Sequence, residues 1–555
     1  MVERVVNRLS GMFRVAMVVV VVVGGCGMAE ASAQQVPTQQ ASAQQVPTQE
    51  PTVGDGQGGY TLQVNAQRVV LDVVVTDKHD APVNGLTKDD FTVFEDKAPQ
   101  AIRTFEETAP KPGAVTPAIS STAELDRLEP DAPVSILVID EVTTSFEDLA
   151  FVRYSLNKYL KAQGDVLEQP TLLVSANFSG IAVLHDYTTS RKVVLDAMEH
   201  HLANYPALGR VGSMTYQSDT INATFRSLIG VAEATAGHPG HKNLIWMGRG
   251  FPAVFLNLLR PEEKEEFQSQ LASCTRLLRD SRVTLDTLDP VGVAAYASAS
   301  DGAGFFVVGN PFANEVDLDR LAASTGGRAI HGRNDLNTAI DETVRDGASF
   351  YTLAYRPSSS SQNAMEFRNI KVVMKDKSYH AKAREGYFAA PTVVAPLLAD
   401  DGRYSKRVVF DFNVASSNLL SYDGVHMTVT RDATTPDKFI LHVRAGDLAL
   451  QMDAARKPST ELTIAVASFD RKGNLLGHNV RVVAAQVNED VSSGGVGERS
   501  IPIPVSIATT TPAARIRFVV RANGNGKIGA ESYFLVDRST LDDPATGIKA
   551  EKVPR

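Results

Sequence analysis

The sequence predicts an α/β protein with a mostly parallel central sheet, a small β module before it and a β-sandwich after it. Apolar strands alternate with amphipathic helices through the middle of the chain, a pattern typical of a parallel sheet covered on both faces. Short strands without intervening helices lie on either side of that region. A chain of 555 residues is also too long for one core, so several domains are expected.

Residues 1–26 have the features of a bacterial signal peptide. Arginines precede the apolar run Val15 to Val23, which is shorter than the roughly 20 residues that span a bilayer. The run ends Val23-Gly24-Gly25-Cys26, which resembles a lipobox, and lipidated Cys26 would then be the mature N-terminus and the membrane anchor. Cleavage after Ala33 is the alternative. We therefore expect an exported protein, either a lipoprotein of the cell envelope or a secreted or periplasmic one.

A tether and a β module are expected before the central domain. Residues 27–59 repeat the segment ASAQQVPTQ and are rich in Gln, Pro, Thr and Gly, a composition that favours a disordered linker. Alternating apolar residues from Val69 to Val75 begin a small β module over 60–108. A Pro- and Ser-rich linker over 109–132 follows it.

Residues 133–390 form the expected α/β domain. The apolar run Val134 to Ile139 predicts a strand buried on both faces, and the spacing of apolar residues over 146–160 predicts the helix that follows. Further strands are expected at 171–176, 181–184, 243–247, 283–288 and 350–355, helices at 190–204, 218–236, 261–280, 317–324 and 336–347, and a closing hairpin at 369–374 and 380–384.

Residues 393–537 return to a β pattern, and 538–555 are expected to be a frayed tail. Strands are expected at 407–414, 426–430, 439–443, 461–469, 479–486, 514–521 and 532–536. Turn sequences such as Asn523-Gly524-Asn525-Gly526 recur between them, which indicates a β-sandwich of immunoglobulin size.

One stretch carries a family resemblance. The strand that ends in Asp140, the hydroxyl-rich turn after it and the next helix resemble the first segment of a von Willebrand factor type A (VWFA) domain. With HPGHKNLIWMGRGFP and SFYTLAYRP, the chain looks like the VWFA-related proteins common in acidobacteria, over about residues 60–390. The resemblance implies a doubly wound sheet that places ligands at the carboxyl ends of its strands.

Type A domains hold a divalent cation at a metal-ion-dependent adhesion site. In the family pattern Asp-x-Ser-x-Ser, Asp140 matches the first position, but Val142 and Thr144 replace the two serines. If Mg²⁺ or Mn²⁺ binds, its ligands are expected to be Asp140 and Thr144, with Thr215 or Thr220 from the second loop.

The third family ligand is missing as well. The Asp expected after the fourth strand is replaced by Gly248 and then Arg249. Losing a carboxylate and gaining a cation reverses the charge balance of the site, so we expect a degenerate site without a cofactor. Asp140 is then either a carboxylate that orders the loop or caps the helix, or part of a binding surface with Arg249.

Other groups that could carry chemistry give weaker signals. His238 and His241 flank a Pro-Gly turn without an evident third ligand, so a loop is favoured over a zinc site. Cys274 is expected to be a buried apolar thiol, and no disulfide partner remains for it after processing of Cys26.

The leading hypothesis is a non-enzymatic binding or scaffold protein of the cell envelope that contacts unidentified protein partners. Its candidate binding residues are Asp140, Thr144, Thr220 and Arg249. The formal net charge of −9 speaks against a general nucleic-acid binder. Two alternatives stay open: a metal-dependent adhesin with a non-standard site, and a hydrolase that uses Asp140, Asp286 or Asp289 at the strand ends.

Overall fold

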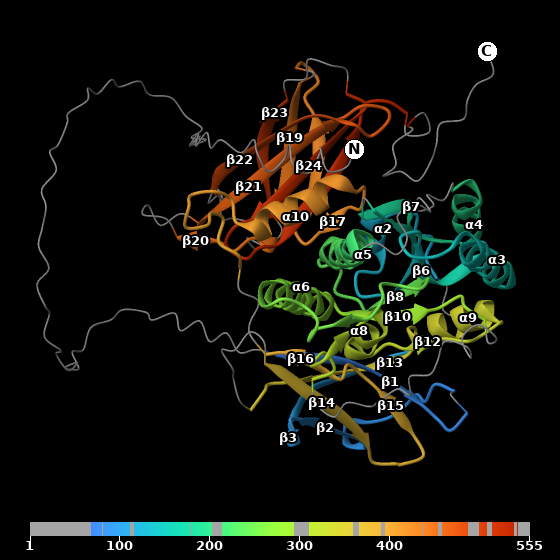
Figure 1. Ribbon diagram of the computed structural model, residues 1–555. Coiled ribbons are helices and arrows are strands. Elements are labelled where there is room, and N and C mark those ends of the chain that lie inside the picture. Colours follow the sequence, from blue (N-terminus) through green and yellow to red (C-terminus); the bar gives the residue numbers. More distant parts are fainter. Residues whose placement is uncertain are drawn as a thin grey trace, which may run out of the picture.

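The structure is a computed structural model that shows three tiers, with an α/β layer between two β units (Figure 1). It describes residues 68–79, 81–110, 116–178, 180–201, 214–292, 310–358, 366–389, 394–435, 437–452, 458–486, 499–507, 513–537 and 541. The signal peptide, Cys26, Ala33 and the 27–59 linker lie outside these residues. Among the described residues, no helix is long and apolar enough to cross a membrane.

The middle tier contains a six-stranded, mostly parallel sheet. Its strand order is β12 (Ala329–Ile330), β10 (Val283–Leu288), β8 (Lys242–Met247), β5 (Val134–Asp140), β6 (Val166–Asn177) and β7 (Gly180–Ser190). All neighbours are parallel except β6 and β7, which are antiparallel. The prediction of a mixed α/β protein with a mostly parallel sheet is confirmed.

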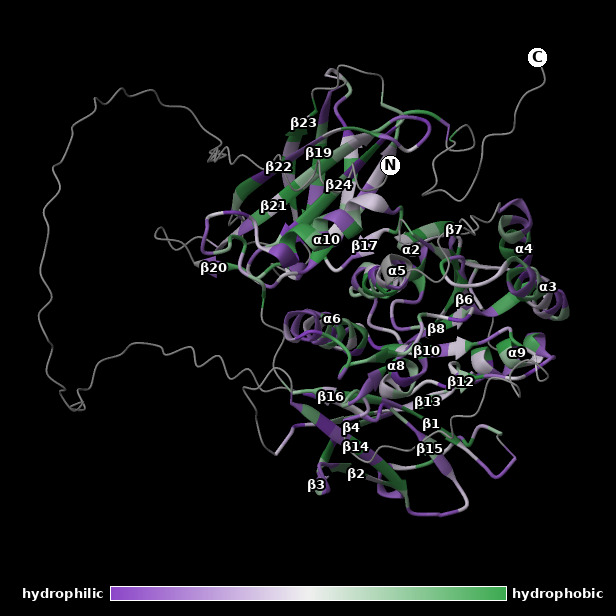
Figure 2. Cartoon of the chain, in the orientation of Figure 1, coloured by the Kyte–Doolittle hydropathy of each residue, from purple (hydrophilic) through white to green (hydrophobic). Residues whose placement is uncertain are grey.

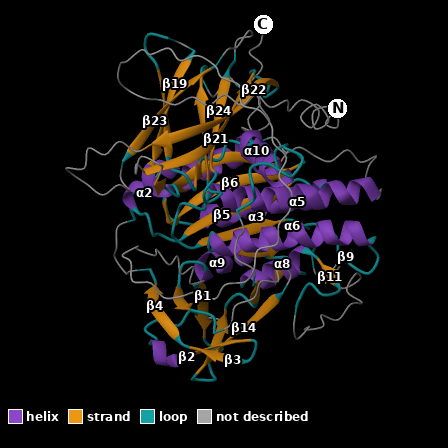
Figure 3. Cartoon of the chain, turned by 90° about the vertical axis from the view of Figure 1, so that its left-hand side faces the viewer, coloured by secondary structure: helices purple, strands orange, loops and turns teal. Residues whose placement is uncertain are grey.

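Helices cover both faces of this sheet because the side chains of β5 alternate between two cores. Ile136 and Val138 pack with residues of α5 (Met214–Ala234), α6 (Pro261–Asp280) and α8 (Leu318–Thr325). Leu137 and Ile139 pack with α3 (Phe146–Ala162), α4 (Arg191–His200) and α9 (Leu336–Asp346). A two-stranded ribbon, β9 (Val254–Phe255) with β11 (Glu315–Val316), is also present. Figure 3 shows α5, α6 and α8 along one face.

The first β unit is built from two distant parts of the chain. One sheet has the order β15 (His380–Lys382), β1 (Val69–Thr76), β13 (Phe350–Tyr355) and β4 (Ile102–Thr108), and the other has the order β16 (Gly386–Phe388), β14 (Phe367–Met374), β2 (Phe91–Glu95) and β3 (Ala98–Gln100). The core joins Leu71 and Val73 to Tyr351 and Leu353. A short 3₁₀ helix, η1 (Lys88–Asp90), precedes β2.

The placement of 350–388 differs from the expectation that this segment belongs to the parallel-sheet domain. β13 pairs with β1 and β4, and β14 pairs with β2. Every residue of β13 is buried, so its sequence reads like a central parallel strand although it lies in an antiparallel sheet. Through this pairing the small N-terminal segment shares a hydrophobic core with β13 and β14, whereas a segment of its size would form only a marginal core alone.

The C-terminal β unit has two antiparallel sheets around one core. The larger has the order β17 (Tyr422–Asp423), β25 (Ile528–Phe534), β24 (Arg515–Ala522), β21 (Pro458–Phe469) and β20 (Gln451–Met452), and β22 (Leu475–Gln486) also pairs with β21. The smaller has the order β18 (Met427–Arg431), β19 (Lys438–Arg444) and β23 (Ser500–Ser506), and η3 (Ala445–Asp447) follows β19. Phe439 and Leu441 meet Phe518 and Leu462 between the sheets. Figure 2 shows apolar residues along β21 and β24.

One expected strand is a helix. Residues 407–414 lie in α10 (Lys406–Ser417), which begins at the N-cap Ser405. The apolar and β-branched residues of this segment suggested a strand, but the buried Val408, Asp411 and Val414 are spaced as on one helical face. Ser405 accepts a hydrogen bond from the Val408 backbone, which satisfies one free donor of the first turn. The prediction of a strand here was wrong because tertiary packing and the cap outweigh β propensity.

Candidate functional site

The candidate site lies where β5 ends at Asp140, at the carboxyl edge of the parallel sheet. The Asp140 side chain is fully buried. Its Oδ1 accepts hydrogen bonds from the backbone N–H groups of Val142 at 2.8 Å and Thr143 at 3.2 Å. Its Oδ2 accepts from the Thr143 hydroxyl at 2.5 Å, and from Trp246 Nε1 and the Gly250 N–H, both at 3.1 Å. Five donors therefore surround this carboxylate.

The loop after β8 closes tightly on the loop after β5. Thr144 is buried, and its Oγ1 accepts a hydrogen bond from the Arg249 N–H at 3.4 Å. A Cβ atom on Gly248 would lie 2.3 Å from the Cβ of Asp140 and 2.5 Å from Thr144 Oγ1. The glycine at the position of the third family carboxylate is thus the residue that lets the two loops touch.

The Arg249 side chain pairs with Asp148. Its Nε lies 3.5 Å from Asp148 Oδ2 on α3, and half of the side chain is exposed. The structure therefore brings Asp140, Thr144 and the Arg249 backbone together. The Arg249 guanidinium pairs with the first turn of α3, the helix that follows β5. That turn begins at the N-cap Ser145, whose hydroxyl accepts from the Asp148 N–H.

Neither threonine proposed for the second loop is seen to join Asp140. Thr220 is buried within α5, and its hydroxyl donates to the Gln217 carbonyl of the same helix at 2.8 Å. Thr215 also lies on α5, but its side chain is outside the described part of the chain. The described residues therefore hold only Asp140 and Thr144 at this edge from the expected ligand set.

The arrangement does not fit a conventional divalent cation. Mg²⁺ prefers about six oxygen ligands in octahedral array. Here the oxygens of Asp140 already accept five hydrogen bonds, three of them from backbone N–H groups that would have to move to make room for an ion. The described residues also contain no group of three His, Cys, Asp or Glu side chains suited to a metal.

Two charged clusters at the same edge were not anticipated. Glu141, directly after Asp140, forms a buried contact through Oε1 with Nε2 of His201. His331, directly after β12, places Nε2 at 2.9 Å from Asp319 Oδ2 and Nδ1 at 3.5 Å from Asp289 Oδ2. These hydrogen bonds, first that of Asp289 and then that of Asp319, raise the pKa of His331 to about 10. For Glu141, a polar residue directly after the buried strand β5 was the available sequence signal, whereas β12 before His331 is not buried.

The carboxylates of the hydrolase alternative are engaged within the fold. Asp286 is buried, accepts a hydrogen bond from the Arg328 N–H at 2.7 Å, and has a pKa raised by burial to about 6. Asp289 accepts from the Val291 N–H at 2.9 Å and faces His331. Both carboxylates hold neighbouring loops in place.

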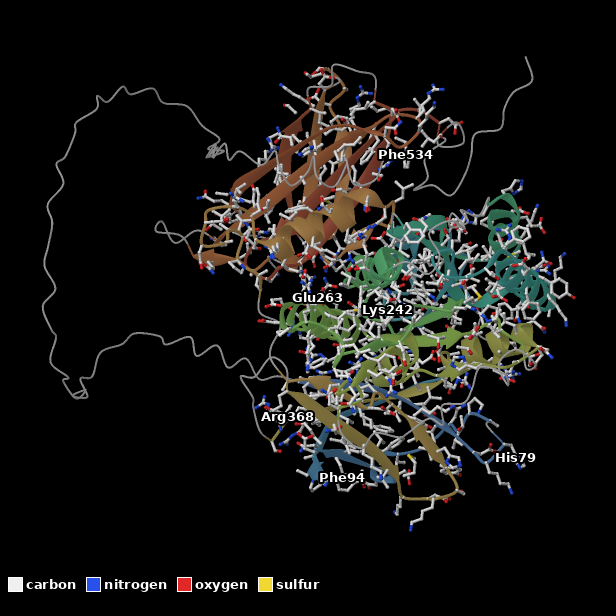
Figure 4. All side chains as sticks on the ribbon, viewed as in Figure 1. His79, Phe94, Lys242, Glu263, Arg368 and Phe534 are labelled. Atoms are coloured by element: carbon white, nitrogen blue, oxygen red, sulfur yellow. The ribbon has the colours of Figure 1, made fainter. Side chains whose placement is uncertain are left out.

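Of the two histidines of the HPGH segment, His241 connects two tiers and His238 stays within the α/β tier. His238 is buried and its Nε2 lies 2.8 Å from the Ala132 carbonyl oxygen, while His241 Nδ1 lies 3.0 Å from Asp72 Oδ2 on β1. Lys242, which follows them, sits inside the molecule in Figure 4 and donates to the His238 carbonyl. Burial lowers the pKa of Lys242 to about 7.

Comparisons with known proteins give only weak structural similarities. No family model and no curated protein matches it. Among solved structures, two crystal forms of proximal thread matrix protein 1 from the mussel byssus match with TM-scores of 0.24, at 10% and 13% identity. These matches cover 39% and 43% of this chain. The chain spans about half the length of the mussel protein, 48% in one match and 51% in the other.

A third match is to a VWA domain. The SpRpn10 VWA domain aligns over 32% of this chain and 99% of its own length, with a TM-score of 0.17 and 13% identity. Similarities this weak carry no argument about function. The chain is a mixed α/β protein with a weak similarity to a VWA domain.

Proposed function

We propose that the protein is an exported binding or scaffold protein of the cell envelope, in which a degenerate VWFA-like domain contacts protein partners without a metal. The observation that supports this proposal best is the closed hydrogen-bond set on Asp140. A carboxylate with five donors stabilises a fixed loop surface. A protein partner can recognise such a surface without an ion bridging the two.

The residues next to Asp140 suit a protein contact. Phe146, the first residue of α3, is 60% exposed, and Arg249 is half exposed beside Asp148. Aromatic and arginine side chains are the residue types that most often dominate binding energy in protein interfaces. The proposed contact surface is therefore Phe146, Asp148 and Arg249, held by the ordered loop beneath them.

Site-specific photocrosslinking tests this contact. A photoreactive phenylalanine analogue at position 146 is expected to give a discrete crosslinked product in cells, and Arg249→Glu should reduce its yield at least fivefold. The matched control is the same analogue at Leu475, an exposed apolar position on β22. Equal labelling from both positions, or labelling unaffected by Arg249→Glu, would reject the proposed surface.

The proposed location depends on Cys26. Incorporation of labelled palmitate in a bacterial host should be lost in Cys26→Ala, and the protein should then leave the membrane fraction. Labelling that persists in Cys26→Ala would instead reject the lipid anchor on this residue, and export would rest on cleavage after Ala33 alone.

A further inference from the structure

A cavity with many charged lining residues lies between the α/β tier and the C-terminal β unit, away from the Asp140 loop. Its volume is about 900 Å³, within the range typical of small-molecule sites. One wall comes from α2 (Thr122–Leu128) and Asp186 of β7. The other comes from Asp423, His426, Met427, Thr428, His442, Arg444 and Arg499. The cavity thus lies at a junction between two units, a common place for ligand sites.

Carboxylates form the more buried part of this cavity. Its acidic lining residues are Asp126, Asp186, Asp423, Asp447 and Glu531. Asp423 is 5% exposed, and the side chains of Asp447 and Asp126 are 13% and 23% exposed. Asp423 accepts from the Gly237 N–H at 2.6 Å, and Asp447 Oδ2 lies 2.9 Å from His426 Nδ1. These contacts fix two of the carboxylates in position.

Asp126 lies close to two histidine side chains. Its oxygens lie 3.8 Å from His426 Nε2 and 3.8 Å from His238 Nδ1, beyond hydrogen-bonding distance. The His238 side chain is 1% exposed, and its Nδ1 has no hydrogen-bond partner among the described residues. A buried polar atom without a partner is costly, and this one lies next to Asp126, which lines the cavity although His238 itself does not.

Guanidinium groups stand at the outer part of the same cavity. Arg127 and Arg444 are both exposed, on α2 and at the end of β19, and Arg499 lines the cavity beside them. Arg444 and Ser500 are register partners on β19 and β23, so Arg444 and Arg499 come from neighbouring strand ends. Arginine recognises carboxylates through paired hydrogen bonds.

We propose that this cavity binds a small zwitterion of the amino-acid or short-peptide class. Its ammonium group would lie near Asp126, Asp423 and Asp447, and its carboxylate would meet Arg444 and Arg499. A polyamine would be repelled by the arginines, and a phosphate or dicarboxylate would be repelled by the buried carboxylates. Opposite charges at opposite ends of the ligand match both parts of the cavity.

Affinity selection with the full chain tests the proposal. An equimolar mixture of free amino acids and a tripeptide library with free termini are each incubated with the protein, and retained compounds are identified by mass spectrometry. We expect retention from one of the two pools, which also distinguishes amino acid from peptide. N-acetylation of the retained compound, or Asp126→Asn, should weaken binding at least tenfold, as should C-amidation or Arg444→Gln.

Two controls keep the outcome interpretable. Glu129→Gln, just after α2 and exposed, should leave binding unchanged. If Asp126→Asn does not fold, Ala123→Trp places an indole at the cavity lining and should block binding instead. Retention from neither pool would overturn the proposal. So would retention that neither Asp126→Asn (or Ala123→Trp in its place) nor Arg444→Gln diminishes.

Discussion

Arg282, just before β10, donates hydrogen bonds to Asp72 of β1 from Nη2 at 2.6 Å and from Nε at 3.2 Å. Asp72 also faces His241 Nδ1 and accepts from the Thr352 hydroxyl, both at 3.0 Å. Burial alone would raise the pKa of Asp72, but the hydrogen bond from His241 and the charge of Arg282 hold it well below its usual value. This pairing fastens the N-terminal β unit to the α/β tier.

Removing the arginine should therefore weaken that junction. We expect Arg282→Met to lower the free energy of unfolding by about 3 kcal/mol, because a buried carboxylate loses its main cationic partner. Arg260→Met, which breaks an exposed ion pair with Glu263, should leave the free energy of unfolding nearly unchanged. Denaturant unfolding of both variants measures the difference. Equal effects would contradict the assigned role of Arg282.

A second charged group joins α5 to α10. Arg407 places Nη2 at 2.6 Å from Glu233 Oε1 and Nε at 2.5 Å from Asp411 Oδ1. Burial is the main cause that raises the pKa of Glu233 to about 8, and the charge of Asp411 adds to it. Because the folded value exceeds the unfolded one, the stability linked to Glu233 is fully present below about pH 4.5 and is lost as pH rises through 8.

Comparison with Glu233→Gln isolates this dependence. The stability of the wild type relative to Glu233→Gln should fall between pH 5 and pH 9, since the variant has no carboxyl group to ionise at this position. Thermal melting across that range measures the difference. A difference that stays constant with pH would show that Glu233 has an ordinary pKa in the folded protein.

His331 should remain protonated at neutral pH. Its ring lies between Asp289 and Asp319, which raise its pKa to about 10, so its contribution to stability is present below about pH 6.5 and is lost as pH rises through 10. NMR titration of the imidazole signals should show no transition of His331 between pH 6 and pH 8. Asp289→Asn should bring the transition toward neutral pH. A wild-type midpoint near 6.5 would contradict the cluster.

The close approach of the two loops makes a specific glycine sensitive to change. Gly248→Ala should destabilise the protein by about 2 kcal/mol or more, because its Cβ would lie 2.3 Å from that of Asp140. Gly164→Ala is the matched control, since its added Cβ would meet its nearest neighbour, the Val166 carbonyl oxygen, at 3.6 Å. Equal unfolding midpoints for the two variants would mean that the loops separate readily.

Periodicity identified the class of the middle tier and most of its elements. The unbroken apolar run over β5 predicts a strand buried on both faces, and β5 is buried throughout. The spacing of apolar residues by three and four in α3 predicts a helix with one buried face, as observed. The same reasoning failed for β13 and α10. Burial on both sides gives no clue to the partner strand, and a short segment with β-branched residues fits either a strand or a helix.

The candidate site was predictable in part. Asp140 was identified because a carboxylate follows a buried strand, and the loop-ordering role was among the interpretations considered for it. The donors Trp246 and Gly250 lie more than 100 positions away, at separations of 106 and 110, so no local pattern could reveal them. The contact between Glu141 and His201 depends on the same long-range packing, at a separation of 60.

The most direct test uses the single tryptophan of the chain, whose indole donates to Asp140 Oδ2. Chelated full-length protein is titrated with Mg²⁺, Mn²⁺ and Ca²⁺ while Trp246 emission and heat are recorded, beside Asp140→Asn. A closed carboxylate predicts no saturable change with any ion, and a lower unfolding midpoint with altered Trp246 emission in the variant. Saturable binding that a folded Asp140→Asn variant abolishes would contradict this account and establish a metal-dependent site.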